Sequence, residues 1–184
     1  MQLIETIRQL LPQKNNVIIA IDGRCGSGKT TLADSLSKQF DCNVVHMDDF
    51  FLRPHQRTPE RLATPGENVD HERFLQEVLL PLKEEKAVCY RPFDCSKMEL
   101  GDVICLEQKK LTVVEGSYSL HSNLWQYYDL RIFSDIDAKT QMERIVKRNP
   151  LSAEMFRNKW IPLEEAYFEA FGIKEKCDII IKTQ

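Results

Sequence analysis

The stretch from Val17 to Leu36 constrains the fold more than any other part of the chain. It begins with the apolar, β-branched-rich run Val-Ile-Ile-Ala-Ile, which predicts a buried strand over 17–22. A turn with glycine at 23, 26 and 28 follows, and the spacing of apolar residues then predicts a helix over 30–40. A strand that passes through glycines directly into a helix is typical of α/β proteins.

The turn itself matches G-x-x-x-x-G-K-[S/T], the phosphate-binding P-loop. Only a backbone without bulky side chains can bring many N–H donors onto phosphate oxygens, and the next helix directs its positive end at the anion. We expect Lys29 to reach the β/γ-phosphates and the Thr30 hydroxyl to bind Mg²⁺. The alternative is a plain glycine turn. The predicted nucleotide-binding residues of the turn are Gly23, Arg24, Cys25, Gly26, Ser27, Gly28, Lys29, Thr30 and Thr31.

Size and charge limit the other functions open to the chain. Its length of 184 residues and hydrophobic content of 42% predict one soluble domain. A net charge of −3 gives no electrostatic reason to expect nucleic acid or an anionic membrane as a partner. Residues 1–11 predict an amphipathic surface helix rather than a signal peptide, and no apolar run has the length of a membrane span. We therefore expect a cytoplasmic protein.

The six cysteines are scattered and form no C-x-x-C pair, which argues against a zinc site. Their mostly apolar surroundings favour reduced, buried thiols. Cys25 is the exception, because its place in the P-loop predicts an accessible thiol.

Further strands and helices alternate along the chain, as expected for a parallel sheet. We predict strands at 43–47, 111–116, 130–133 and 178–181, and helices at 71–85, 138–148 and 162–171, the first two capped by Asp70 and Asp137. We predict a long functional loop or a surface excursion at 52–69 and an extended piece at 87–94. A small hairpin is predicted at 95–110, and a loop or lid at 149–161. The chain is thus predicted to be one domain over 1–184, with a substrate-side insertion at about 50–105 and a lid at about 148–161.

Carboxylates stand at the ends of two predicted strands. Because ligands bind at the carboxyl ends of parallel strands, Asp48, Asp49 and Glu115 should meet the P-loop in one cleft. Asp48 or Asp49 could accept a proton from a substrate hydroxyl, and Glu115 could hold Mg²⁺ or orient that hydroxyl. The alternatives are a solvated turn for the aspartates and a capped strand end for Glu115.

Arg144, Lys147 and Arg148 share one face of the helix that precedes the predicted lid. They could close over the β/γ-phosphates, with Arg148 favoured because it is nearest the lid; the alternative is a solvated stripe. The four histidines show no metal spacing, and only His71 is expected on the substrate side.

With these residues in place, the chain resembles the uridine kinase-like branch of the P-loop kinases, which includes nicotinamide riboside kinase, phosphoribulokinase and bacterial pantothenate kinase. The glycine loop looks like that of the family, and Asp48-Asp49-Phe50-Phe51 is similar to its Asp-[Ser/Asp]-Phe-[Tyr/Phe] motif. The Glu115-Gly116 strand end, the Asn68–His71 and Arg91–Asp94 segments and the lid entry at Glu143–Asn149 also resemble family motifs.

The resemblance implies a P-loop NTPase fold, in which a five-stranded parallel sheet lies in a three-layer α/β/α arrangement with a helical lid. It also implies ATP- and Mg²⁺-dependent phosphorylation, with Asp48 as the base or the ligand of the acceptor hydroxyl. Asn149 replaces the family's aspartate, Asn-Pro-Leu-Ser replaces its arginine-rich lid, and Phe93 replaces a tyrosine, so the resemblance supports a kinase more than it supports uridine as the acceptor. The residues expected to contact the acceptor are Asp48, Phe50, Arg53, His71, Arg91, Phe93, Asp94 and Glu115.

The sequence therefore predicts a kinase that transfers the γ-phosphoryl group to a hydroxyl of a small metabolite, with a nucleoside or ribosyl compound favoured. A non-catalytic nucleotide sensor that kept the fold is the main alternative. A plain nucleoside triphosphate hydrolase is a third, against which the proline- and arginine-rich segment at 52–69 argues for an acceptor site.

Overall fold

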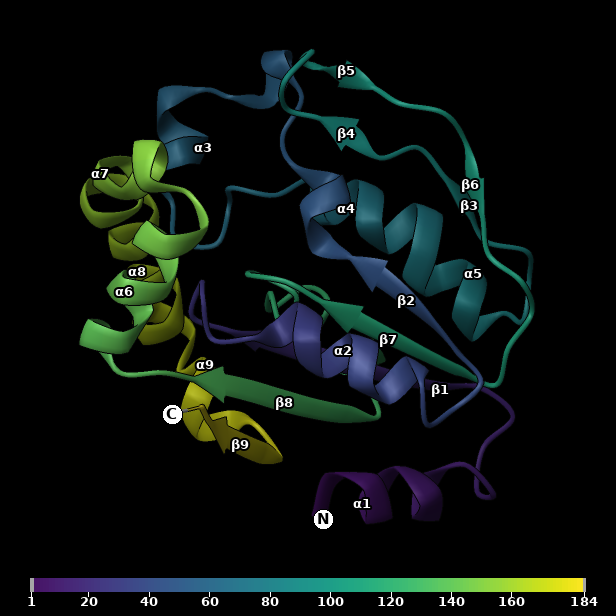
Figure 1. Ribbon diagram of the computed structural model, residues 1–184. Helices are drawn as coiled ribbons and strands as arrows, with labels where there is room; N and C mark the ends of the chain where they lie inside the picture. The colour runs from purple at the N-terminus through teal and green to yellow at the C-terminus, as the bar shows by residue number, and fades with distance from the viewer. Residues whose placement is uncertain (1, 184) are drawn as a thin grey trace.

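A computed structural model describes residues 2–183 and has a five-stranded parallel sheet at its centre (Figure 1). The strands lie in the order β2 (Cys42–His46), β7 (Leu111–Glu115), β1 (Val17–Gly23), β8 (Leu130–Asp135) and β9 (Ile179–Lys182). Ile21 and His46 are both in register with Glu115, so the carboxyl ends of β1, β2 and β7 are level. The predicted fold class is confirmed.

Two hydrophobic cores lie on the two faces of the sheet, because successive side chains of a strand point to opposite faces. Ile19 and Ile21 of β1 pack with α1 (Gln2–Leu10) and α2 (Lys29–Ser37) on one face. Ile18 and Ala20 pack on the other face with the helices of residues 71–83 and with α8 (Ile161–Phe171). The predicted amphipathic helix is α1, although its first expected residue lies outside the described range.

The segment between β2 and β7 contains more regular structure than predicted. Within the predicted loop 52–69, Pro54 and Pro59 begin short helices, because proline is favoured at the first position of a helix. Asp70 caps the following helix by accepting the Arg73 backbone N–H at 3.2 Å, as predicted. The elements are the 3₁₀ turns η1 (Met47–Phe50) and η2 (Pro54–Gln56), the helices α3 (Pro59–Ala63), α4 (His71–Phe74) and α5 (Leu80–Lys83), the π-helical turn η3 (Leu75–Leu79), and the paired strands β3 (Cys89–Tyr90) with β6 (Ile104–Cys105) and β4 (Phe93–Asp94) with β5 (Glu99–Leu100).

The lid is helical, as the predicted fold class has it, and residues 149–161 take the lid alternative of the predicted loop or lid. After α6 (Ala138–Arg148), which Asp137 caps as predicted, the chain forms η5 (Pro150–Ser152), α7 (Ala153–Met155) and the π-helical turn η6 (Phe156–Trp160), which continues into α8. Pro162 lacks the N–H of a normal helical turn, and its ring would clash with the carbonyl four residues earlier. The wide π turn before it relieves this clash, and η3 stands in the same position before Pro81. The remaining helices are η4 (Trp125–Tyr127) and α9 (Ile173–Lys176).

Cys89 and Cys105 form a disulfide between β3 and β6, where they are register partners with Cα atoms 4.1 Å apart. The expectation of reduced, buried thiols is therefore wrong for this pair. The two cysteines are separated by 16 positions and belong to no motif that would predict the pairing.

Among the described residues, no helix has both the length and the apolar character to cross a bilayer.

Candidate active site

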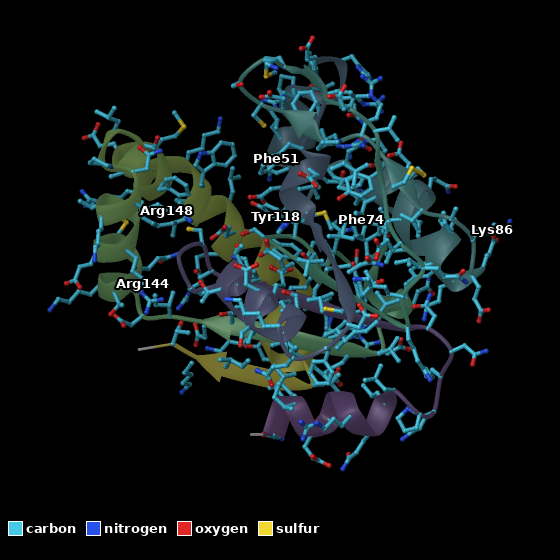
Figure 2. All side chains as sticks on the ribbon, turned by 45° about the vertical axis from the view of Figure 1, so that its right-hand side comes forward. Phe51, Phe74, Lys86, Tyr118, Arg144 and Arg148 are labelled. Atoms are coloured by element: carbon cyan, nitrogen blue, oxygen red, sulfur yellow. A yellow bond between two sulfur atoms is a disulfide. The ribbon has the colours of Figure 1, made fainter. Side chains whose placement is uncertain are left out.

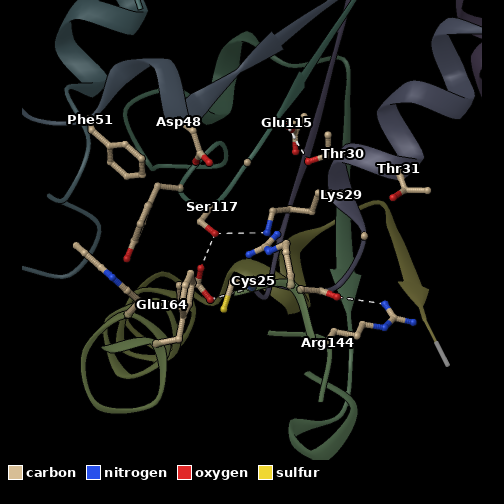
Figure 3. Close-up of a pocket in the computed structure, with 17 residues that line it drawn as sticks. Cys25, Lys29, Thr30, Thr31, Asp48, Phe51, Glu115, Ser117, Arg144 and Glu164 are labelled. Atoms are coloured by element: carbon tan, nitrogen blue, oxygen red, sulfur yellow. Dashed lines mark hydrogen bonds between the residues drawn. The ribbon is translucent and has the colours of Figure 1, made fainter. Parts of the chain in front are cut away.

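A cavity opens at the carboxyl ends of β1, β2 and β7 (Figure 3). Its volume of about 660 Å³ lies within the usual range for small-molecule sites. The P-loop, the end of β2, the loop after β7 and the lid all contribute to its wall. Figure 2 shows Arg144 and Arg148 on the lid side and Phe51 on the insertion side. The lining residues are Cys25, Gly26, Gly28, Lys29, Thr30, Thr31, Asp48, Phe51, Glu115, Gly116, Ser117, Tyr118, Arg144, Arg148, Phe156, Trp160 and Glu164.

The P-loop wraps the mouth of the cavity and ends at the first turn of α2. At Gly23, with φ of 131°, a Cβ atom would lie 2.1 Å from the Ser134 carbonyl oxygen, so only glycine fits beside β8. Lys29 is buried and donates to the Gly23 carbonyl at 2.6 Å and the Arg24 carbonyl at 3.1 Å. The ammonium is thus held by the loop's own carbonyls and must turn outward to meet a phosphate.

Three predicted loop residues shape the P-loop rather than line the cavity. Gly23 allows the close contact with β8, and Ser27 is fully buried, with its carbonyl accepting the Ser134 hydroxyl. Arg24 points away and pairs with Glu165 at 2.6 Å. The remaining predicted loop residues all lie in the cavity wall.

Thr30 and Glu115, the predicted metal ligands, are neighbours in the structure. The Thr30 hydroxyl donates to Glu115 Oε1 at 3.1 Å. Two hard oxygen atoms about 3 Å apart suit adjacent positions around an octahedral Mg²⁺ ion, so this pair fits the cation that the fold implies. His46 Nδ1 lies 2.6 Å from the same oxygen, and this hydrogen bond to Glu115 raises the pKa of His46.

The structure separates the two adjacent aspartates. Asp48 opens into the cavity, where the protein packed around it disfavours its charge and raises its pKa, while nearby Lys29 acts in the opposite direction. Asp49 instead accepts the Tyr90 hydroxyl at 3.1 Å and lies outside the cavity wall. Of the two, Asp48 is therefore the one placed to meet a ligand beside the P-loop.

The Glu115 end of β7 packs very closely against the turn that carries Asp48. Gly116 has φ of 135°, and a Cβ atom there would lie 2.9 Å from Met47 Cβ. This close contact brings Glu115 and Asp48 to the same cavity.

Lid side chains close the cavity from the opposite side. Arg144 donates to the Gly26 carbonyl at 3.1 Å, and Arg148 lines the cavity, while its role as a clamp stays a prediction. Gln141 donates to the carbonyl of Cys25, a residue that is only 9% exposed. Burial raises the pKa of the Cys25 thiol to about 12, so the expectation of an accessible, reactive thiol is wrong.

The predicted acceptor-side residues, apart from Asp48 and Glu115, lie outside the cavity wall. Phe50 is fully buried against Phe74 and Tyr90, so its expected place in the wall is corrected; the next residue, Phe51, lines the cavity instead. For the others, the role of acceptor contact stays a prediction. Their observed partners are Asp70 for Arg53, Glu67 for His71, the Leu100 and Gly101 carbonyls for Arg91, the Arg57 guanidinium for the Phe93 ring, and Ser96 for Asp94.

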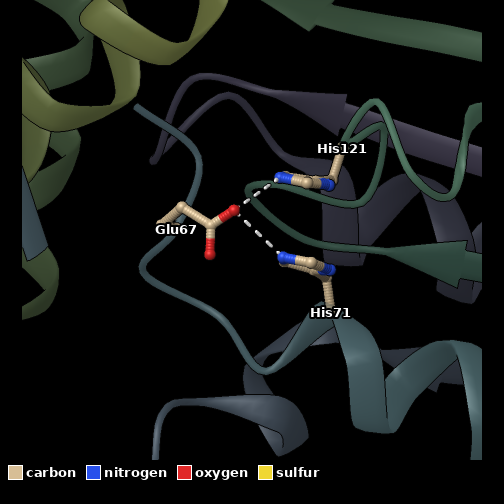
Figure 4. A group of neighbouring side chains, drawn as sticks. All are labelled: Glu67, His71 and His121. Atoms are coloured by element: carbon tan, nitrogen blue, oxygen red, sulfur yellow. Dashed lines mark hydrogen bonds and ion pairs between the residues drawn. The ribbon is translucent and has the colours of Figure 1, made fainter. Parts of the chain in front are cut away.

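His71 belongs to a second polar group, with Glu67 and His121 (Figure 4). The two imidazole rings stack with centroids 4.0 Å apart, and their Nε2 atoms lie 3.1 and 3.6 Å from Glu67 Oε1. Burial lowers the pKa of His121 to about 4, and its Nδ1 accepts the Asn123 N–H, so Nε2 carries the proton. His71 Nε2 is within hydrogen-bond distance of Glu67, whereas His121 Nε2 lies too far from that carboxylate for a hydrogen bond and has no other partner among the described residues, so the polar group is only partly satisfied.

Seven cavity residues were not predicted as site residues from the sequence: Phe51, Gly116, Ser117, Tyr118, Phe156, Trp160 and Glu164. Ser117 and Tyr118 directly follow the Glu-Gly strand end, which is a usable signal. Phe156, Trp160 and Glu164 gave none, because the predicted loop or lid over 149–161 and the predicted helix over 162–171 did not show which side chains turn toward the cavity.

A P-loop, a threonine–glutamate pair and an arginine-bearing helical lid lie together at one edge of a five-stranded parallel sheet, which is the arrangement of a P-loop NTPase fold. No family model matches the chain. The chain is 29% identical over 187 residues to the uridine kinases of Staphylococcus aureus strains JH9 and Newman, an alignment that covers 91% of this chain and 88% of theirs. The resemblance to the uridine kinase-like branch of the P-loop kinases is thus confirmed.

Solved structures agree on the fold. A possible uridine kinase from Bacillus stearothermophilus superposes with a TM-score of 0.68 at 19% identity, covering 98% of this chain and 100% of that one. A candidate fructose transport system kinase from Silicibacter sp. TM1040 gives a TM-score of 0.67 at 21% identity, over 91% and 90% of the two chains.

Proposed function

We propose that the protein is an ATP-dependent kinase that transfers the γ-phosphoryl group to a hydroxyl of a small metabolite, most favourably a nucleoside or ribosyl compound. The observation that carries the proposal is that Lys29, the Thr30–Glu115 pair and Asp48 line one cavity. Phosphoryl transfer needs charge neutralisation at the phosphates and a carboxylate at the attacking hydroxyl, and these residues offer both.

Each residue would have a defined task in that reaction. The loop amides and Lys29 hold the phosphates, and Arg148 closes over them from the lid. Thr30 and Glu115 hold Mg²⁺, which neutralises phosphate charge when bound. Asp48 orients the acceptor hydroxyl and accepts its proton. Its pKa is raised toward neutral pH, which makes the carboxylate a stronger base than an ordinary aspartate.

Two observations support the proposed acceptor class. The relatives from Staphylococcus aureus are uridine kinases. In addition, Phe51, Tyr118 and Trp160 give the cavity aromatic walls, against which a planar base could stack.

The test is an acceptor screen. The protein is incubated with ATP, Mg²⁺ and a panel of nucleosides, ribosyl compounds and sugars, and ADP release and product mass are followed. Acceptor-dependent ADP release is expected. Tight ATP binding without such release would support a nucleotide sensor, and equal release with and without acceptors would support a hydrolase.

Asp48→Asn tests the role of the carboxylate. We expect turnover to fall by about 10²-fold or more while nucleotide affinity is retained, because the substitution removes a base but no phosphate contact. Asp49→Asn is the matched control, since the neighbouring carboxylate binds Tyr90 outside the cavity. Full turnover by Asp48→Asn, or an equal loss in both variants, would contradict the proposed role.

A further inference from the structure

Glu164 of α8 directs a buried carboxylate at the P-loop (Figure 3). The residue is only 4% exposed. Glu164 Oε2 accepts the Cys25 backbone N–H at 2.9 Å, and Oε1 accepts the Ser117 hydroxyl at 2.5 Å. A lid residue therefore uses a donor of the very loop whose amides serve to bind phosphate.

Lys29 lies beside this contact. Its ammonium is 3.4 Å from the Ser117 hydroxyl oxygen and is otherwise bound to the loop carbonyls. The P-loop lysine belongs at the β/γ-phosphates when nucleotide is bound, so the Glu164 carboxylate lies on the β/γ side of the phosphate site. A buried carboxylate needs donors, and those that Glu164 has found are next to the groups a triphosphate requires.

We infer that Glu164 competes with the terminal phosphates of the nucleotide for the P-loop, so that triphosphate binding must displace it. The inference rests on the nucleotide site of the proposed function. Two anions a few ångströms apart in a partly dry cavity repel each other strongly, whereas either alone is satisfied by the loop. Glu164 is thereby a residue that sets the affinity for nucleotides according to the charge of their phosphate chain.

The residues next to Glu164 hold α8 in place on the P-loop side. Glu165 holds Arg24 through two hydrogen bonds of 2.6 and 3.0 Å, and the Tyr167 hydroxyl binds buried Asp22 at 2.9 Å. These bonds anchor α8 to the P-loop. The π-helical turn η6 precedes Glu164 and places Trp160 in the cavity wall, so displacement of Glu164 is expected to change the surroundings of that indole.

The first experiment measures affinity. Glu164→Ala and Glu164→Gln are compared with the wild type by calorimetric titration with a non-hydrolysable ATP analogue plus Mg²⁺, and with AMP. Both variants should bind the ATP analogue about tenfold tighter or more, and AMP with little change, because the competing charge is gone. Glu169→Ala, on an exposed position of the same helix, should leave both affinities unchanged. Unchanged or weaker binding of the analogue by both Glu164 variants would overturn the inference.

The second experiment follows Trp160 emission in a Trp125→Phe background, which leaves one tryptophan. The ATP analogue should shift the emission of this protein, and adding Glu164→Ala should produce much of that shift without nucleotide. An emission unchanged by Glu164→Ala, with a full response to the analogue, would overturn the inference while leaving nucleotide binding intact. No binding of the analogue by the wild type would instead overturn the proposed function on which the inference rests.

Discussion

Asp22 joins the P-loop to the lid through one buried carboxylate. It is fully buried at the end of β1 and accepts the N–H groups of Gly23 at 2.7 Å, Tyr118 at 3.2 Å and Leu120 at 2.9 Å, together with the Tyr167 hydroxyl. Its donors come from the P-loop, the loop after β7 and α8. Burial raises the pKa of Asp22 to about 6, although these donors and Lys29 oppose the rise.

This raised pKa predicts an unusual pH dependence of stability. The native state keeps the Asp22 proton to higher pH than the unfolded chain, whose aspartates titrate near pH 4. The stabilising contribution is therefore complete below that pH and is lost as the pH rises through about 6, a change of about 3 kcal/mol for two pKa units. Urea unfolding of the wild type and Asp22→Asn between pH 4 and 7 checks this. The free energies of the two proteins should differ by a pH-dependent amount; a constant difference would contradict the prediction.

At the residue scale, the sequence placed Lys29, Thr30, Asp48 and Glu115 correctly at one edge of the sheet, because each follows the end of a strand or a motif. It chose Phe50 for the cavity where the structure has Phe51, since an irregular turn has no periodicity to show which ring faces the core. Glu164 was also beyond reach: one glutamate on a helix looks like a solvated residue until tertiary packing turns it inward.

At the scale of elements, the lid shows what local sequence signals leave open. Asn149-Pro150 has the pattern of a helix breaker and does end α6, but Pro150 also begins η5, where Asn149 accepts the Ser152 N–H at 3.3 Å. The helix through Pro162 exists because a π turn accommodates that ring and because tertiary contacts stabilise α8. Neither the wide turn nor those contacts can be derived from the local pattern.

Substitution of Arg148 tests whether the lid acts as a clamp on the phosphates. Arg148→Ala should slow phosphoryl transfer much more than it weakens nucleotide binding, because a closing arginine acts mainly on charge that develops in the transition state. Single-turnover rates and nucleotide dissociation constants check this, with Lys147→Ala as the control on the same helix outside the cavity wall. Equal effects of Arg148→Ala on rate and binding would count against the clamp.

Removal of the disulfide tests how much it stabilises the insertion. The Cys89–Cys105 bond closes a loop with a sequence separation of 16, so its loss should destabilise this region by up to about 3 kcal/mol on a chain-entropy argument. Cys105→Ser should lower the melting temperature and abolish the effect of added reductant on it. Cys95→Ser, which removes an exposed free thiol, should do neither. A reductant effect that persists in Cys105→Ser would show that another thiol is responsible.

At the scale of the whole molecule, the alternation of strands and helices was enough to predict a parallel sheet. The order of the strands was not, because the placement of β1 between β7 and β8 depends on contacts between residues about a hundred positions apart. The short paired strands of the insertion lack any clear alternation and were predicted only as a hairpin.

The two cores should respond differently to mutation. Ile7 of α1 is fully buried on the face covered by α1 and α2, and contributes nothing to the cavity wall. Ile7→Ala should reduce the free energy of unfolding by about 2–5 kcal/mol and leave nucleotide affinity unchanged at temperatures where the protein is folded. Chemical denaturation and titration check this, with exposed Gln9→Ala as the control. A weakened nucleotide affinity in folded Ile7→Ala would show that the two faces are coupled.

The missing side chain at Gly116 has a consequence for engineering. Any larger residue there must push β7 away from Met47, and the first distance to grow would be that between the metal-side and acceptor-side acids. We therefore expect Gly116→Ala, where the protein remains folded, to slow phosphoryl transfer more than it weakens nucleotide binding, because the two carboxylates would no longer face one another across the reacting groups.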